Sequence, residues 1–403
     1  MMNSRNKVLD FVNKYTMVIV LILVIIFFSA RTGGAILYPS NVSNLISQNA
    51  YVFILATGML LCILTGGNID LSVGSVVCFV GAVGATLMVS KGLNPVLSVI
   101  IMFVIGTLIG AWQAFWIAYV RIPPFIVTLS GMLIFRGLSN VVLDGMTVSL
   151  NTEGTLGFVK AFGGGANCYI PDFIGGSGSS INVTCIVATA IAIVIFLLIM
   201  VKNRMTRLKK NYEVENMGPW MSKMIIISVV IGAFGFRLSQ YKGIPNVLLI
   251  VVGVIIIYSY ITSNTTTGRY FYAVGGNEKA TKLSGINTNK VYFLAYTNMG
   301  LLAALAGMVT IARMTSAQPT YGQNYEMDAI ASCFIGGASA YGGIGTVPGV
   351  IIGALLMGVI NLGMFSMGVD QNMQKVVKGL VLLAAVIFDV VSKRGGKLMA
   401  KNA

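Results

Sequence analysis

The chain has 403 residues, of which 56% are hydrophobic and only 10% are charged, and its mean hydropathy is +0.85. Soluble domains carry about 25% charged residues, so this composition excludes an ordinary soluble protein. The formal net charge of +15 could indicate a nucleic-acid partner. The basic residues instead lie in short segments between apolar runs, as they do in the cytoplasmic loops of membrane proteins. We therefore expect a lipid membrane, and no nucleic acid, as the surroundings of this chain.

Apolar runs close to the length of a membrane-spanning helix recur along the chain. They lie at Tyr15–Ala30, Leu45–Leu64, Leu71–Val89, Pro95–Tyr119, Pro124–Leu143, Val183–Val201, Ser222–Phe236, Val247–Ile261, Leu294–Ile311, Val347–Phe365 and Val376–Val391. A further run, Asp328–Ser339, is too short to cross a bilayer alone. The pattern predicts an all-α, polytopic integral membrane helical bundle with about 10–12 transmembrane segments, some of them broken or re-entrant.

The positions of Lys and Arg predict the topology. Basic residues gather in the N-terminal segment, in residues 202–221, in residues 262–290 and after the last apolar run. Under the positive-inside rule these segments are cytoplasmic, so both termini are expected inside the cell and residues 144–182 form an extracytoplasmic loop. We predict a single transmembrane domain, 1–403, whose first apolar run is an uncleaved helix and not a signal peptide.

Two glycine-rich interruptions lie at the seams between apolar runs. The first contains Gly66, Gly67, Asn68, Asp70, Ser72 and Gly74, and the second contains Gly336 and Gly337 after Glu326 and Asp328. Paired broken helices in a polytopic protein indicate a translocation site, because backbone freed from a helix is tolerated at membrane depth only inside protein or beside water. We expect the paired glycines to have positive φ angles or close backbone contacts.

Four charged residues lie beside or within these runs. Asp70, Glu326 and Asp328 stand next to helix breaks, where a carboxylate can cap a helix N-terminus or can titrate as an ion site. Both roles, and contact with the transported solute, are compatible with the pattern. Arg136 lies inside an apolar run, where a charge needs an interior partner. For Arg136 we favour a structural pairing with a carboxylate or with carbonyls over a place in a polar conduit.

The residue types needed for catalysis or cofactor binding are scarce. The chain has no His, no Gly-x-x-x-x-Gly-Lys-Ser/Thr sequence, and five Cys without metal-ligand spacing. We therefore expect no enzyme activity, no metal and no cofactor in this chain. Cys168 and Cys185 flank the outer loop and could form a disulfide, but we favour two free thiols.

The segment 268–287 has the pattern of a short, capped helix. Asn277 suits the N-cap, Glu278 to Leu283 favour helix, and Gly285 suits the C-terminal cap. Ala280 and Leu283 would form an apolar side able to dock in a groove of a partner protein. The alternative is a helix that rests on the lipid surface.

Four motifs in order resemble the permeases of monosaccharide ABC importers, such as the ribose, galactose and xylose systems. They are Gly66-Gly-Asn-Ile-Asp-Leu-Ser-Val-Gly74, Pro123-Pro-Phe-Ile-Val-Thr-Leu129 with Phe135-Arg-Gly137, Ala273-Val-Gly-Gly-Asn-Glu-Lys-Ala280 with Leu283-Ser-Gly285, and Asp328-Ala-Ile-Ala-Ser-Cys-Phe-Ile-Gly-Gly337. The additional hairpin at 202–261 resembles the longer xylose and multiple-monosaccharide branch. Asn68 departs from the family pattern, which usually reads Gly-Gly-Ile-Asp.

The resemblance implies a division of labour between chains. It implies a homodimer of permeases in the bacterial cytoplasmic membrane, ATP-binding subunits that hold ATP and Mg, and an extracytoplasmic sugar-binding protein. The loop Asn277 to Gly285 would be the coupling helix, and the two breaks would line an alternating-access path. An ion-coupled sugar transporter that works alone is the second interpretation.

Overall fold

The computed structural model describes residues 2–163, 168–176 and 181–401. Helices account for 76% of the chain, and the strands in these ranges are one antiparallel pair, β1 (Val148–Ser149) and β2 (Ser316–Ala317). Nine helices of the described part are long and apolar enough to cross a membrane. The expected all-α polytopic fold is therefore confirmed.

Each predicted apolar run coincides with a helix or with part of one, and several helices extend beyond their runs. They are α1 (Met2–Arg31), α2 (Pro39–Leu64), α3 (Val73–Ala85), α4 (Pro95–Ala118), α5 (Pro124–Leu143), α6 (Glu153–Phe162), α7 (Val183–Lys209), α8 (Met217–Ser239), α9 (Asn246–Asn264), α10 (Thr266–Gly276), α11 (Glu278–Leu283), α12 (Thr288–Met314), α13 (Tyr325–Ile335), α14 (Val347–Ser366) and α15 (Gln371–Lys401). A 3₁₀ turn, η1 (Ala35–Leu37), precedes α2, and a π-helical turn, η2 (Thr86–Ser90), extends α3.

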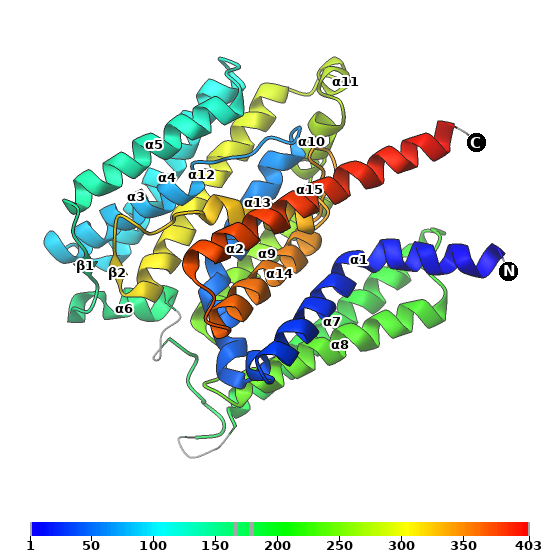
Figure 1. The fold of residues 1–403 in the computed structure, drawn as a ribbon, viewed down its shortest axis with the longest axis horizontal. Coiled ribbons are helices and arrows are strands. Elements are labelled where there is room, and N and C mark those ends of the chain that lie inside the picture. Colours follow the sequence, from blue (N-terminus) through cyan, green and yellow to red (C-terminus); the bar gives the residue numbers. More distant parts are fainter. Residues whose placement is uncertain (1, 164–167, 177–180, 402–403) are drawn as a thin grey trace.

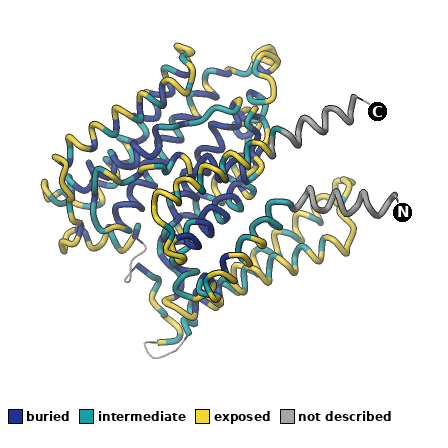
Figure 2. The backbone as a smooth tube through the Cα atoms, in the orientation of Figure 1, coloured by how far each residue is buried: buried dark blue, intermediate teal, exposed yellow. Residues whose placement is uncertain are grey.

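The helices run between two ends of the molecule, which we call the α11 end and the α6 end (Figure 1). Helices α10 and α11 lie at the α11 end, whereas α6, β1 and β2 lie at the α6 end. Buried residues concentrate in α2, α3, α12, α13 and α14 (Figure 2). Helices α1, α7 and α8 form a separate layer beside this core.

Small residues bring the core helices into direct backbone contact. A Cβ added at Gly110 of α4 would lie 2.6 Å from the Tyr296 carbonyl oxygen of α12, and one added at Gly300 would lie 2.3 Å from the Gly106 carbonyl oxygen. Such close approach is how membrane helices gain packing energy without a hydrophobic driving force. The core that holds the breaks is therefore rigidly packed.

Two of the expected loops contain more helix than the sequence predicted. The loop 144–182 contains β1 and α6, because α6 buries Thr155 and Phe158 against the bundle. Helix α7 continues past its apolar run to Lys209, since Lys and Arg are good helix formers. The basic loop 202–221 therefore shrinks to a short link between α7 and α8.

Helices α3 and α13, which correspond to the predicted runs Leu71–Val89 and Asp328–Ser339, have different lengths. Together with η2, α3 forms a continuous segment, Val73–Ser90, of spanning length. Helix α13 has 11 residues, and its first residue, Tyr325, stacks on Tyr51 near the middle of α2. Helix α13 therefore starts at mid-depth and runs toward the α11 end.

Candidate functional site

The two breaks predicted from sequence lie against each other at the α11 end. We call residues 65–72 the first break and residues 336–346 the second break. The Gly343 amide donates to the Leu64 carbonyl over 3.0 Å, and a Cβ added at Gly67 would lie 1.9 Å from the Ala340 carbonyl oxygen. The breaks therefore form one backbone junction, although about 270 residues of sequence separate them.

The glycines of this junction have the predicted backbone features. Gly66, Gly67 and Gly337 have φ angles of 129°, 75° and 87°. Gly336 has a negative φ of −70°, but a Cβ there would lie 2.5 Å from the Gly349 carbonyl oxygen. Each of the four positions therefore has either a left-handed backbone or a close backbone neighbour, as expected.

A buried polar chain holds the first break. Asp70 Oδ1 accepts hydrogen bonds from the Ser72 amide at 2.8 Å and from the Ser72 hydroxyl at 2.7 Å. The Ser72 hydroxyl in turn accepts a bond from Gln113 Nε2 of α4 at 2.9 Å. Asp70, Ser72 and Gln113 are all buried. Asp70 thus binds an orphan amide just before α3, while Ser72 occupies the N-cap position.

The other members of the first motif lie beside the same site. The Asn68 amide group is half-buried and lies 3.4 Å from the Thr65 carbonyl oxygen. A Cβ added at Gly74 would lie 2.1 Å from the Gly322 carbonyl oxygen and 2.5 Å from Glu326 Oε2. Gly74 therefore brings α3 into contact with the segment that leads to α13, where Glu326 is also buried.

Asp328 does not cap α13, which corrects the capping interpretation for this residue. Its Oδ2 accepts hydrogen bonds from the Tyr51 hydroxyl at 2.7 Å and from Lys378 Nζ at 3.1 Å. The Lys378 ammonium also lies 3.0 Å from Oδ1. Asp328 of α13 therefore forms an ion pair with Lys378 of α15 and a hydrogen bond with Tyr51 of α2. Together these contacts join the three helices.

A small polar cavity lies next to this ion pair, between α2, α12 and α13. Ser47, Gln48, Tyr51, Thr310, Arg313 and Tyr325 line it. The Tyr51 and Tyr325 rings stack with centroids 3.6 Å apart. Val309 and Met314 complete the lining, and the cavity has a volume of about 10 Å³, which is room for about one water.

Sequence reasoning missed Arg313, Lys378 and the two tyrosines. Lys378 had a signal, because it is a cation inside the last apolar run. Arg313 lies two residues beyond the run that ends at Ile311, so the sequence pattern is that of a boundary residue. The tyrosines carried no signal that distinguished them from interface anchors.

Arg136 has the structural role that we favoured. Its Nη1 atom donates to the Tyr321 carbonyl at 2.7 Å and to the Pro319 carbonyl at 3.1 Å. These carbonyls belong to the irregular segment between β2 and α13, whose backbone needs partners at membrane depth. Arg136 therefore secures the segment that brings α13 to mid-depth.

The predicted capped helix forms with the predicted bounds. Asn277 Oδ1 accepts a hydrogen bond from the Ala280 amide at 3.0 Å, α11 covers Glu278–Leu283, and Gly285 has a φ of 84°. Leu283 is 89% exposed and Ala280 is exposed too. An apolar side chain so fully exposed beyond the core suits contact with another chain or with lipid.

An ionic cluster fastens α11 to the loop between α4 and α5. Arg121 Nη1 lies 2.7 Å from Glu278 Oε1, and the Tyr292 hydroxyl donates to Glu278 Oε2 at 3.1 Å. Arg121 adopts a φ of 65° to reach this position. Partial burial opposes ionisation of Glu278, but the hydrogen bond and charge of Arg121 together with Tyr292 lower its pKa. The carboxylate therefore stays charged at neutral pH.

Helix α10 connects α11 to both breaks. A Cβ added at Gly275 would lie 1.7 Å from the Leu64 carbonyl oxygen and 2.4 Å from the Gly343 amide. The Tyr272 hydroxyl donates to the Gly345 carbonyl at 2.8 Å. One short helix therefore lies between α11 and the junction of the breaks.

The cysteines are free thiols. Cys168 and Cys185 are both buried and unpaired, as are Cys62, Cys78 and Cys333. This confirms the interpretation that the outer loop carries two thiols and not a disulfide.

Comparison with known proteins agrees with the four motifs. Residues 41–386 match the family described as "Branched-chain amino acid transport system / permease component". The xylose transport system permease protein XylH of Haemophilus influenzae is 36% identical over 380 residues, which cover 94% of this chain and 96% of that protein. The ribose import permease protein RbsC of Escherichia coli is 34% identical over 350 residues, covering 87% and 85%.

The related RbsC of Bacillus subtilis is 33% identical over 353 residues, covering 88% of this chain and 85% of that protein. No solved structure matches the chain significantly. With its apolar helices, the chain is a multi-pass protein of the bacterial inner membrane. By the match over residues 41–386 and by these relatives, the chain belongs to the family of branched-chain amino acid transport system permease components.

Proposed function

We propose that this chain is the membrane-spanning permease of an ABC importer that translocates a monosaccharide. The observation that carries the proposal is the capped, exposed helix α11, which is linked through α10 to both breaks. The relatives named for xylose and ribose supply the substrate class. The chain itself acts as a permease and not as an enzyme.

The proposed cycle uses the contacts described above. An ATP-binding subunit, which holds ATP and Mg, docks on Ala280 and Leu283 and moves α11. Gly275 transmits this motion to Leu64 and Gly343, where the two breaks meet. The close approach of Gly275 to Leu64 and Gly343 involves backbone atoms. A displacement would therefore pass between these segments without being absorbed by side-chain rotation. The junction then opens and closes the path toward the α11 end.

Two further partners complete the proposed complex. Importers of this family work with ATPases and binding proteins in general. For this chain we place an extracytoplasmic sugar-binding protein at the α6 end and a second permease copy beside the first. The side chains of Tyr51, Arg313 and Tyr325 carry hydroxyl and guanidinium groups that could bond a hydroxylated solute, but the cavity between them is about 10 Å³. It has room for about one water, so these helices would have to separate before a sugar could meet them.

Reconstitution tests this function. Proteoliposomes would contain the chain with or without its ATP-binding subunit, and uptake of labelled xylose and ribose would be measured with the binding protein and ATP supplied. Uptake should require all three components. Uptake by the chain alone, driven by a proton or sodium gradient and indifferent to ATP, would establish the ion-coupled alternative instead.

A further inference from the structure

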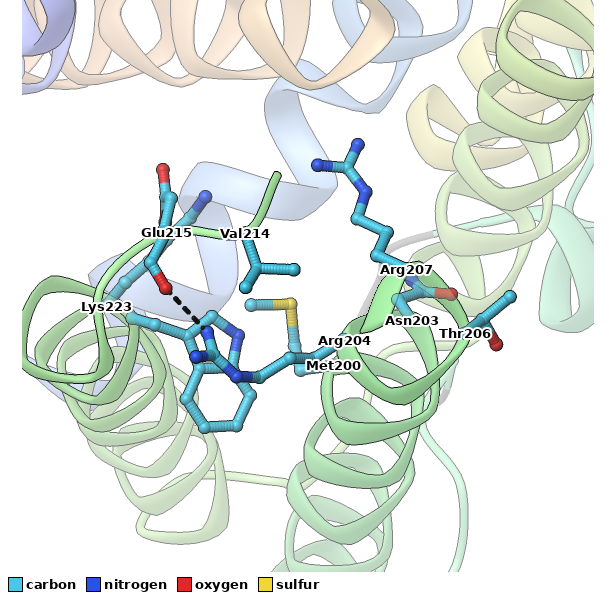
Figure 3. A pocket seen from close by; sticks show the side chains of 9 residues that line it. Met200, Asn203, Arg204, Thr206, Arg207, Val214, Glu215 and Lys223 are labelled. Carbon is cyan, nitrogen blue, oxygen red and sulfur yellow. Dashed lines mark hydrogen bonds between the residues drawn. The ribbon is translucent and has the colours of Figure 1, made fainter. Parts of the chain in front are cut away.

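The α7–α8 hairpin carries a basic pocket at the α11 end, where its helices meet the link between them (Figure 3). Three cationic side chains, Arg204, Arg207 and Lys223, line it together with one carboxylate residue, Glu215. The lining therefore has an excess of positive charge. Trp220, from the first turn of α8, closes one wall.

The three cations have different roles in this pocket. Arg204 builds the wall, because its Nη1 donates to the Glu215 carbonyl at 2.8 Å and its guanidinium lies 4.8 Å from the Trp220 ring centroid. Arg207 and Lys223 stand on opposite sides of the opening (Figure 3). Within the described part of the chain, neither side chain makes a hydrogen bond or an ion pair. Two charges are thus available to one ligand.

An apolar groove continues from the basic pocket toward the middle of the hairpin. Leu197, Val201, Met221, Met224, Ile225 and Val229 line it, and Trp220 borders both spaces. Val201 ends the apolar run of α7 and Lys202 begins the basic segment. The groove therefore lies at the level of the acyl chains, and the basic pocket lies at the level of the headgroups.

The buried residues of the hairpin lie away from this level. The buried residue of α7 is Cys185, and those of α8 are Gly235, Leu238 and Ser239. All four lie toward the α6 end, where the hairpin joins the bundle. Since α7 and α8 are highly apolar, their unpacked halves need lipid around them.

We infer that this composite pocket binds an anionic phospholipid. The phosphate lies between Arg207 and Lys223, and one acyl chain occupies the groove below Trp220. Positive charge selects anionic over zwitterionic headgroups. The adjoining apolar groove selects a lipid over a soluble phosphate, because a soluble anion would leave that groove without a partner. The site would anchor the hairpin to the leaflet at the α11 end.

Tryptophan fluorescence can test the site in the full-length permease. The chain has three Trp residues, so a Trp112→Phe/Trp116→Phe background leaves Trp220 as the reporter. Vesicles of phosphatidylcholine would contain a small fraction of either bromo-acyl phosphatidylglycerol or bromo-acyl phosphatidylcholine. We expect phosphatidylglycerol to quench Trp220 at several-fold lower mole fraction. Arg207→Gln/Lys223→Gln should abolish this preference, at about five-fold in affinity for each cation.

A matched control removes the same charge elsewhere at the same end. Arg269→Gln/Lys290→Gln should retain the preference, because these exposed residues of α10 and α12 do not line the pocket. Equal quenching by both lipids in the parent would overturn the inference, because it would indicate that only ordinary boundary lipid surrounds Trp220. If inorganic phosphate alone protected Trp220 from quenching by bromo-acyl phosphatidylglycerol, that result would also overturn the inference, in favour of a soluble anion as the ligand. Each variant should elute from size-exclusion chromatography as the folded parent does. A lost lipid preference then reports on the pocket and not on unfolding.

Discussion

At the residue scale, the ion pair between Asp328 and Lys378 is the strongest new feature of the core. Asp328 is 1% exposed, and its carboxylate contacts the Lys378 ammonium and the Tyr51 hydroxyl. Removing one partner of a buried pair leaves an uncompensated charge, whereas removing both is often tolerated. The two effects can be separated by mutation.

Lys378→Met should therefore lower the stability of the permease by about 3–5 kcal/mol. The double variant Asp328→Asn/Lys378→Met should recover much of this loss. Thermal unfolding in detergent would measure both. Lys375→Met, on an exposed position one turn earlier in α15, is the control and should leave the unfolding temperature unchanged. An equal loss in the single and double variants would contradict the pairing.

The glycines of the breaks differ in what an added Cβ would meet. Gly67 combines a φ of 75° with a carbonyl oxygen that would lie 1.9 Å from an added Cβ, whereas Gly337 has a φ of 87° and open space. Gly337→Ala should lower the stability of the permease by about 1–2 kcal/mol, because only the left-handed backbone opposes the new Cβ. Gly67→Ala should lower the stability by more than this, because its Cβ would also clash with the Ala340 carbonyl oxygen. It should therefore impair transport more strongly than Gly337→Ala.

Uptake per folded permease would rank these two variants. Gly154→Ala, in α6 with no atom within 4 Å of the added Cβ, is the control. It should be neutral or slightly stabilising, since Ala is the better helix former. Wild-type transport in Gly67→Ala would show that the two breaks need no close contact.

At the element scale, α11 is a helix of 6 residues that depends on its caps and its anchors. Too short to be stable alone, it is held by Asn277 at its start and by the Arg121–Glu278 pair at its base. Its apolar side chain Leu283 contributes nothing to that anchoring, because it is almost fully exposed. The element therefore presents a rigid apolar contact to a partner.

Leu283→Asp should weaken association with the ATP-binding subunit by about 2–5 kcal/mol, because it would bury an unpaired charge in the partner's groove. Co-purification of the two subunits and ATP-dependent uptake would both report the loss. Leu208→Asp, at an exposed position in the last turn of α7, makes the same change away from α11 and should leave association intact. Full co-purification of Leu283→Asp would indicate that α11 rests on lipid.

At the scale of the whole molecule, sequence predicted the helices better than their contacts. The apolar runs and the caps at Asn277 and Gly285 are local signals, so the presence of the long helices and the bounds of α11 followed from them, whereas several long helices extend well beyond their apolar runs. The Asp328–Lys378 pair joins residues 50 apart. It could not be read from spacing, because no local rule says which helices become neighbours. The same holds for the contact of Gly67 with Ala340.

The orientation of the bundle is the remaining whole-molecule prediction. Helix α11 and the link between α7 and α8 share one end of the molecule (Figure 1), and the basic segments 202–221 and 262–290 at that end predict that it is cytoplasmic. The five native cysteines are all buried, so one introduced thiol can report alone. We compare Leu283→Cys in α11 with Leu156→Cys in α6, both at exposed positions.

A membrane-impermeant maleimide applied to intact cells, with the outer membrane permeabilised where there is one, should label Leu156→Cys and spare Leu283→Cys. After disruption of the inner membrane both should react, which shows that each thiol is accessible. The parent chain, with its buried thiols, is the control for background labelling. Labelling of Leu283→Cys in intact cells would place α11 outside, where no ATP-binding subunit could reach it, and would refute both the predicted topology and the proposed coupling role.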